Sequence, residues 1–366
     1  MSEVKIGIFQ CFTLTLLFDL GTAMVVNLGV DTGKDAWLAV LIGGIVGILP
    51  FMGYVYLYKA YPKDPLSRYA RKLLGKYLGG VVALLFIVLF LMMAARDLRD
   101  GSTMLVMATM HRTPLFFVSL LMVLSCAYVA HKGVEVLART SLLFGILVML
   151  IGGFCGLMML FSGKINLLRI LPLFQNGVMP VIRSILIQNY MFPFGEMICF
   201  TMLMPYLMDS RRGPWMIIGA MLFSTLLLSL TTVLNLSVLG VDIVARSPLP
   251  LMPTISKISI SDFIQRLDVL VVMVLIIGVF FKITVFYIAA LVGISDLFGL
   301  PYRTMAYPAA LIILVMSMLN ARGFTEHLDE GKRLLYTVFP VFVLAIPALL
   351  IIITAVKRHR SAPRSD

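Results

Sequence analysis

The sequence predicts an all-α integral membrane protein with about ten transmembrane helices. Of its 366 residues, 60% are apolar and only 13% are charged, and the mean hydropathy is +1.01. Soluble domains carry about 25% charged residues, and they could not bury this much apolar surface. Apolar runs also recur at about the 20-residue length that one bilayer crossing needs. No segment is typical of a soluble domain, so we expect a single transmembrane domain over residues 1–366.

Ten apolar runs are candidate spans, in chain order. They cover residues 7–28, 36–58, 79–99, 115–130, 140–161, 182–207, 215–239, 267–294, 304–320 and 334–356. We interpret the first run as a retained helix rather than a signal peptide, because a single Lys precedes it and no small-residue cleavage site follows. Two connections are longer, 162–181 and 240–266. The sequence leaves open whether each is an amphipathic helix at the interface or an extended loop.

Basic residues indicate the orientation. The net charge is +12. One cluster lies between the second and third spans and another forms the tail: Lys59, Lys63, Arg68, Arg71, Lys72 and Lys76, then Lys357, Arg358, Arg360 and Arg364. An even number of crossings puts both clusters on one side, so we place them, and both termini, in the cytoplasm. Most basic residues lie between apolar runs, so membrane lipid explains the charge better than nucleic acid does.

The sequence contains no motif for catalysis. It has no phosphate-binding Gly-rich loop, HExxH or nucleophile elbow. The four cysteines each lie in an apolar run without a CxxC spacing, which is typical of buried small hydrophobic residues: Cys11, Cys126, Cys155 and Cys199. We therefore expect no enzyme activity, no cofactor and no metal site.

Three ionisable residues matter because they lie well inside spans, where a charge costs several kcal/mol and is a candidate for function: Asp19, Glu196 and Lys282. Two interpretations stay open. Either Glu196 or Asp19 pairs with Lys282 to fasten helices together, or at least one of them lines a polar cavity. Other ionisable residues lie near span ends, where we expect them to face headgroups or water: Arg96, Asp97, Arg266 and Asp268.

Helix breaks occur in the first and sixth spans. Pro193 lacks an N–H group, and Gly195 follows two residues later. The first span has a milder interruption at Gly21-Thr22-Ala23. Breaks at corresponding positions in two halves indicate inverted repeats, here about 7–161 and 182–356, with a binding site near the bilayer midplane. In the second span, Gly43, Gly44 and Gly47 predict close helix packing.

Five segments carry a resemblance that runs along nearly the whole chain: Asp35–Leu38, His131–Arg139, Leu171–Gly177, Phe192–Glu196 and Asp262–Asp268. In them the chain resembles the spore germination protein family, specifically the germinant receptor B subunit, a branch of the amino acid–polyamine–organocation transporters. The resemblance implies a LeuT-like fold of five plus five helices. It also implies a location in the spore inner membrane, partners in an A subunit and a lipoprotein C subunit, and a small nutrient ligand, often an amino acid.

By position, Gly21, Thr22 and Ala23 match the family's unwound segment in helix one, and Phe194, Gly195 and Glu196 match that in helix six. The chain departs from its relatives in having Ala23 where a second Gly is usual and an acid at position 19. The candidate ligand-binding residues are Asp19, Gly21, Thr22, Ala23, Pro193, Phe194, Gly195, Glu196 and Lys282. For an amino acid, we expect the carboxylate to meet N–H groups near Gly21–Ala23 and the ammonium to meet carbonyls around Pro193 and Phe194.

Three functions remain in competition. The first is a receptor subunit that senses a germinant by changing conformation. The second is a proton-coupled amino acid transporter, and the third is a structural membrane subunit without a ligand. Span 140–161 has no ionisable residue, which favours sensing over proton coupling.

Overall fold

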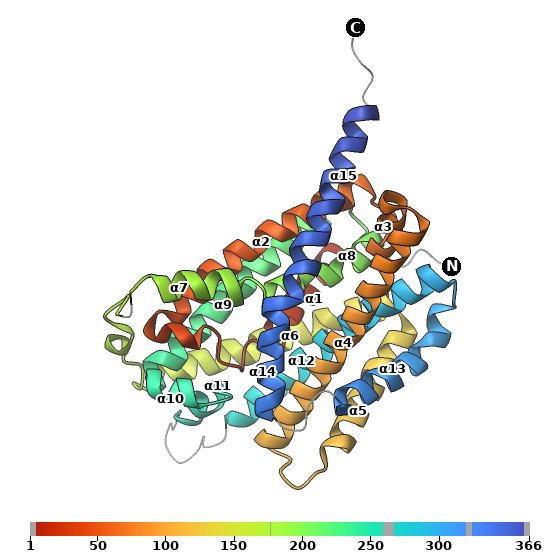
Figure 1. Ribbon diagram of the computed structural model, residues 1–366. Helices are drawn as coiled ribbons and strands as arrows, with labels where there is room; N and C mark the ends of the chain where they lie inside the picture. Colours follow the sequence, from red (N-terminus) through yellow and green to blue (C-terminus); the bar gives the residue numbers. More distant parts are fainter. Residues whose placement is uncertain (1–4, 176, 259–266, 320–323, 362–366) are drawn as a thin grey trace.

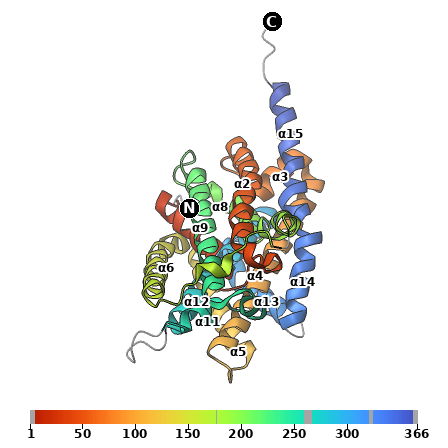
Figure 2. The ribbon, with the colours of Figure 1, turned by 90° about the vertical axis from the view of Figure 1, so that its left-hand side faces the viewer.

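The computed structural model describes residues 5–175, 177–258, 267–319 and 324–361. Within these residues the chain is helical and contains no named strand; Ile6 and Leu207 form one isolated parallel bridge. The long helices lie side by side in one bundle, and α15 projects beyond it (Figures 1 and 2). The fold class that the sequence predicts is therefore confirmed.

Eight helices of the described part are long and apolar enough to cross a membrane. They cover Val30–Ala60, Lys76–Ala108, Leu115–Lys132, Val134–Phe161, Gly213–Leu239, Asp268–Phe298, Tyr302–Leu319 and Arg333–His359. These are the predicted second to fifth and seventh to tenth spans. The first and sixth predicted spans are not among these eight helices, because each is broken into pieces too short to cross a membrane as one helix.

The broken spans are built from short pieces. In the first, α1 (Ile8–Leu20) has only 13 residues. The sixth is divided into α7 (Met179–Ser184), η3 (Ile185–Asn189), η4 (Phe194–Cys199), α8 (Phe200–Leu203) and η5 (Met204–Tyr206). The unbroken helices that surround them are η1 (Val30–Asp35) with α2 (Ala36–Ala60), α4 (Lys76–Ala108), α5 (Leu115–Lys132), α6 (Val134–Phe161), α9 (Gly213–Leu239), α12 (Asp268–Phe298) and α13 (Tyr302–Leu319). The tenth span consists of α14 (Phe324–Thr337), η6 (Val341–Ala345) and α15 (Ile346–Ser361).

The long connections contain no long interfacial helix in their described residues. Connection 162–181 holds the four-residue η2 (Leu167–Ile170) before α7 begins. Connection 240–266 holds α10 (Val241–Arg246) and α11 (Leu251–Ser256); Arg266 and most of the Asp262–Asp268 segment lie outside the described residues. The strongly amphipathic helix is instead α3 (Leu66–Leu74), in the basic connection, which buries Leu66, Ala70 and Leu73.

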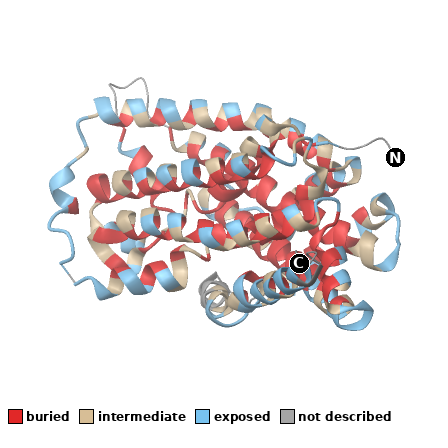
Figure 3. Ribbon diagram, turned by 90° about the horizontal axis from the view of Figure 1, so that it is seen from above, coloured by how far each residue is buried: buried red, intermediate tan, exposed pale blue. Residues whose placement is uncertain are grey.

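The core is centred on α12, which packs against α4, α1, α5 and α6. Most of its residues from Val271 to Gly293 are buried, and buried residues concentrate on the inward surfaces of the bundle (Figure 3). A helix that is apolar on all sides is one that is surrounded by others.

The glycines of α2 mark close packing, as predicted. A Cβ at Gly44 would lie 2.2 Å from Thr225 Oγ1 in α9. At Gly43 and Gly47 it would lie 2.4 Å from Asn189 and 2.5 Å from Phe194, both in the sixth span. The absence of side chains therefore lets α2 approach α9 and the broken span.

The basic cluster and the tail lie on the same face of the bundle. Arg68 and Arg71 each place a guanidinium nitrogen 2.7 Å from the carboxylate of Asp296. Lys357 donates to the carbonyl of Lys72 at 3.2 Å. Their shared side agrees with the sequence analysis; their cytoplasmic location stays a prediction.

Candidate functional site

The first break begins where α1 ends at Leu20. Gly21 has φ 14° and ψ −122°, and the chain continues in turns until η1 begins at Val30. The backbone N–H groups of Thr22 and Ala23 donate no backbone hydrogen bond within the described part of the chain. The predicted break therefore leaves polar donors in the interior of the bundle.

Gly21 and Gly278 leave no room for a side chain where the end of α1 meets α12. A Cβ at Gly278 of α12 would lie 2.9 Å from the Gly21 Cα, and a Cβ at Gly21 would lie 2.8 Å from Lys282 Cδ. The end of α1 thus lies directly on α12, and the Lys282 side chain passes over it.

The second break separates η3 from η4. Gly195 N–H donates to Met191 O at 2.9 Å, and Glu196 N–H donates to Pro193 O at 3.2 Å. The Pro193 carbonyl thus already accepts one hydrogen bond, because the chain resumes as a tight helical turn; a contact of carbonyls around Pro193 and Phe194 with a ligand ammonium stays a prediction.

A buried ionic cluster joins the two breaks. Lys282 Nζ lies 2.7 Å from Glu196 Oε2 and 3.7 Å from Asp97 Oδ1, and it donates to Thr22 Oγ1 at 3.5 Å. Lys282, Glu196 and Asp97 are 0%, 1% and 3% exposed. Of the two interpretations of the sequence, pairing of Glu196 with Lys282 is present, and Glu196 also faces a cavity.

Aromatic rings complete the surroundings of the ammonium. The Phe192 ring centroid lies 4.2 Å from Lys282 Nζ, and that of Phe18 lies 5.9 Å away. A ring face attracts a desolvated cation by about 2 kcal/mol. Lys282 is therefore held by two carboxylates, one hydroxyl and two rings.

Asp97 and Arg96 were expected at a span end, facing headgroups or water, but they are buried within the bundle and line the cavity described below. The third span was predicted to end at residue 99, but α4 continues to Ala108. The extra turns place both residues inside the bundle, where they are buried. Sequence hydropathy could not show this, because the charged residues from Arg96 to Asp100 resemble the end of a span.

Asp19 belongs to a separate polar contact. Ser224 Oγ of α9 donates to Asp19 Oδ2 at 2.7 Å, and Asp19 is fully buried. Its other oxygen has no hydrogen-bond partner, and Asp19 forms no ion pair among the described residues. Lys282 is thus the partner of Glu196 and Asp97 rather than of Asp19.

A cavity of about 550 Å³ reaches this cluster. Its inner wall is formed by Thr22, Asp97, Phe192 and Glu196, and it extends to the end of the bundle that carries η1, α10 and α14. Of the candidate residues, Thr22 and Glu196 line the cavity. Asp19, Gly21, Ala23, Pro193, Phe194, Gly195 and Lys282 are not among its described lining residues.

Of these residues, Lys282 supports the cavity wall from behind. Lys282 contacts four lining side chains: Thr22, Asp97, Phe192 and Glu196. A Cβ at Gly195 would meet Met191 and Val343 at 3.4 and 3.5 Å. Sequence reasoning missed Asp97 and the pair Gln188 and Asn189 as lining residues. Two adjacent amides inside a predicted span were the signal that could have found them.

Comparison with known proteins places this architecture in a family. A family model described as "Spore germination protein" matches residues 5–324. Spore germination protein KB of Bacillus subtilis (strain 168) is 38% identical over 98% of this chain and 97% of its own length. Spore germination protein A2 of the same organism is 22% identical over 98% of each chain.

Solved structures show the same fold at low identity. The nucleobase-cation-symport-1 family transporter Mhp1, in a closed conformation with bromovinylhydantoin bound, aligns with TM-score 0.71 and 12% identity over 96% of this chain and 78% of its own. MhsT in complex with L-phenylalanine aligns with TM-score 0.71 and 13% identity over 96% and 89%. The chain therefore belongs to the spore germination protein family and has a LeuT-like transporter fold, with the first and sixth helices broken around a buried ionic cluster.

Proposed function

We propose that this chain is the membrane subunit of a spore nutrient-germinant receptor. The observation that carries the proposal is the cavity that meets both helix breaks at Thr22 and Glu196. Its volume lies within the range of about 300–1,000 Å³ that is usual for small-molecule sites. A small nutrient such as an amino acid binds there and shifts the chain between two conformations.

The wall offers complementary groups to an amino acid. The N–H group of Thr22, which lines the cavity, donates no backbone hydrogen bond in the described chain, so it is suited to a carboxylate. Glu196 is already paired with Lys282. Asp97 Oδ2 has no hydrogen-bond partner among the described residues, and Asp97 lines the cavity. We therefore assign Asp97, ahead of Glu196, to the ligand ammonium.

The ionic cluster supplies the route for a signal. Lys282 links α12 to α4 and to both breaks. A ligand ammonium that contacts Asp97 therefore competes with the ion pair between Asp97 and Lys282. A ligand shifts the conformational equilibrium only by its difference in affinity for the two states. Partner subunits, A and the lipoprotein C, read this shift at the spore inner membrane, with both termini of this chain cytoplasmic.

The alternative is a proton-coupled amino acid transporter. It is favoured by the fold shared with two transporters, although fold alone does not fix function. The two functions differ in whether the stabilising nutrient crosses the membrane. Uptake into liposomes that contain the purified chain, driven by a proton gradient, would identify a transporter; binding without uptake supports a receptor.

Thermal stabilisation of the purified chain by amino acids, sugars and nucleosides tests the proposal. A ligand at 100 times its Kd stabilises the folded state by about 2.7 kcal/mol. We expect one class to stabilise the wild type, Asp97→Asn to weaken this effect, and Asp209→Asn, outside the cavity, to leave it unchanged. Absence of stabilisation by all three classes would contradict the proposal.

A further inference from the structure

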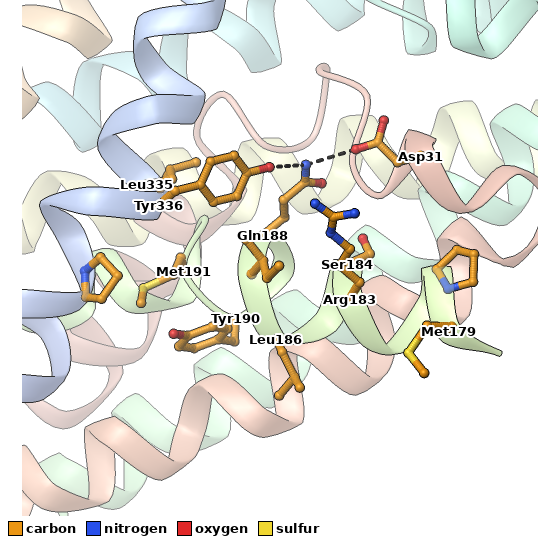
Figure 4. A pocket seen from close by; sticks show the side chains of 13 residues that line it. Asp31, Met179, Arg183, Ser184, Leu186, Gln188, Tyr190, Met191, Leu335 and Tyr336 are labelled. Atoms are coloured by element: carbon orange, nitrogen blue, oxygen red, sulfur yellow. Dashed lines mark hydrogen bonds between the residues drawn. The ribbon is translucent and has the colours of Figure 1, made fainter.

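A second cavity, of about 800 Å³, forms a groove between the broken sixth span and α14 (Figure 4). Its walls are largely apolar and include Met179, Leu186, Met191 and Leu335. Met179 and Leu186 are 73% and 57% exposed. Apolar side chains this exposed beside transmembrane segments face acyl chains rather than water.

One end of the groove is polar and rich in donors. Gln188 Nε2 donates to Asp31 Oδ2 and to the Tyr336 hydroxyl oxygen, each at 2.9 Å. The amide thereby uses both of its hydrogens, and the Tyr336 hydroxyl keeps its own hydrogen for another acceptor. Asp31, the one carboxylate of the described lining, already accepts from Gln188.

Arg183 lies beside this chain of hydrogen bonds and lines the groove (Figure 4). Its guanidinium forms no ion pair or hydrogen bond within the part of the chain that the structure describes. The guanidinium and the apolar groove beside it together favour a ligand that has an anionic head group with several acceptor oxygens and an apolar tail. A guanidinium forms two parallel hydrogen bonds to phosphate oxygens. An apolar protein segment in the groove would offer Arg183 no such acceptor.

We propose that this groove binds an anionic phospholipid. The phosphate meets the Arg183 guanidinium and the Tyr336 hydroxyl, and one acyl chain lies along the exposed side chains of Met179 and Leu186. Membrane lipid can reach the groove because both of its walls belong to transmembrane segments. Since Asp31, Gln188 and Tyr336 also border the central cavity, a bound lipid holds one wall of that cavity in place.

Lipid-dependent melting of the full chain in a neutral detergent tests the proposal without any nutrient. The probes are phosphatidylglycerol, phosphatidylcholine and inorganic phosphate. We expect phosphatidylglycerol to raise the Tm well above the effect of the other two. In Arg183→Gln, half of the effect should need about tenfold more phosphatidylglycerol. The control is Arg112→Gln, at an exposed residue of the connection between α4 and α5, which should behave as wild type.

A second variant tests the apolar part. Leu186→Trp fills the groove without changing charge, and it should reduce the lipid effect while the Tm without lipid stays near that of wild type. Three results would overturn the proposal: equal stabilisation by the two phospholipids, an unchanged response of Arg183→Gln, or inorganic phosphate as effective as phosphatidylglycerol. The first would indicate an apolar occupant, and the last a free-anion site.

Discussion

The Lys282 ammonium lies 2.7 Å from the Glu196 carboxylate, in a part of the bundle where both side chains are buried. Lys282 belongs to α12 and Glu196 to η4, next to the second helix break. Since the Lys282 stem also passes over Gly21, at the first break, this ion pair fixes the two breaks relative to each other.

Neutralising either partner of this pair should destabilise the protein strongly. Glu196→Gln or Lys282→Gln leaves the remaining charge buried with fewer partners, which costs about 3–5 kcal/mol. The double variant should recover part of that loss, because no uncompensated charge from the pair remains. Tm and membrane abundance of the three variants measure this. If Glu196→Gln kept wild-type stability, the pair would not be structural.

Asp19 should matter for stability and not for nutrient affinity. Ser224→Ala removes the one hydrogen bond that the described chain gives to the Asp19 carboxylate, at a cost of about 1–3 kcal/mol. Asp19→Asn should leave the nutrient dissociation constant within about twofold, because Asp19 lies outside the cavity lining. A tenfold weaker nutrient affinity in Asp19→Asn would place Asp19 in the site.

The approach of α2 to α9 should not tolerate a side chain. Gly44→Ala puts a Cβ 2.2 Å from Thr225 Oγ1, and overpacking of this kind costs about 1–3 kcal/mol. Adding Thr225→Ala should restore part of the Tm, because two of the three contacting atoms are removed. Gly152→Ala in α6, where a Cβ meets no atom within 4 Å, is the matched control and should not lower the Tm. Equal Tm values for Gly44→Ala and the control would refute the packing argument.

Cysteine labelling tests the orientation. Lys63→Cys is exposed in the basic connection, and the four natural cysteines are buried and give a low background. An impermeant reagent added outside intact cells should leave Lys63→Cys unlabelled and should label Lys164→Cys, in the connection after α6. The reverse pattern would invert the topology.

The sequence alone determined the membrane class, eight of the spans and the positions of both helix breaks. These follow from local chemistry: apolar length, a missing proline N–H group and glycine at Gly21 and Gly195. It also identified Asp19, Glu196 and Lys282 as ionisable residues well inside spans, because a charge in an apolar run is visible without a structure.

Only the tertiary structure decided which charges meet. From the sequence, Lys282 could have paired with either Asp19 or Glu196. The crossing of α12 over Gly21 brings it to Glu196, and also to Asp97, which the sequence did not indicate. Asp97 was assigned to a span end because hydropathy averages over a window and does not show how far a helix continues into the bundle. The cavity likewise depends on side chains from five separate segments, and their convergence is set by long-range packing that no local pattern of residues encodes.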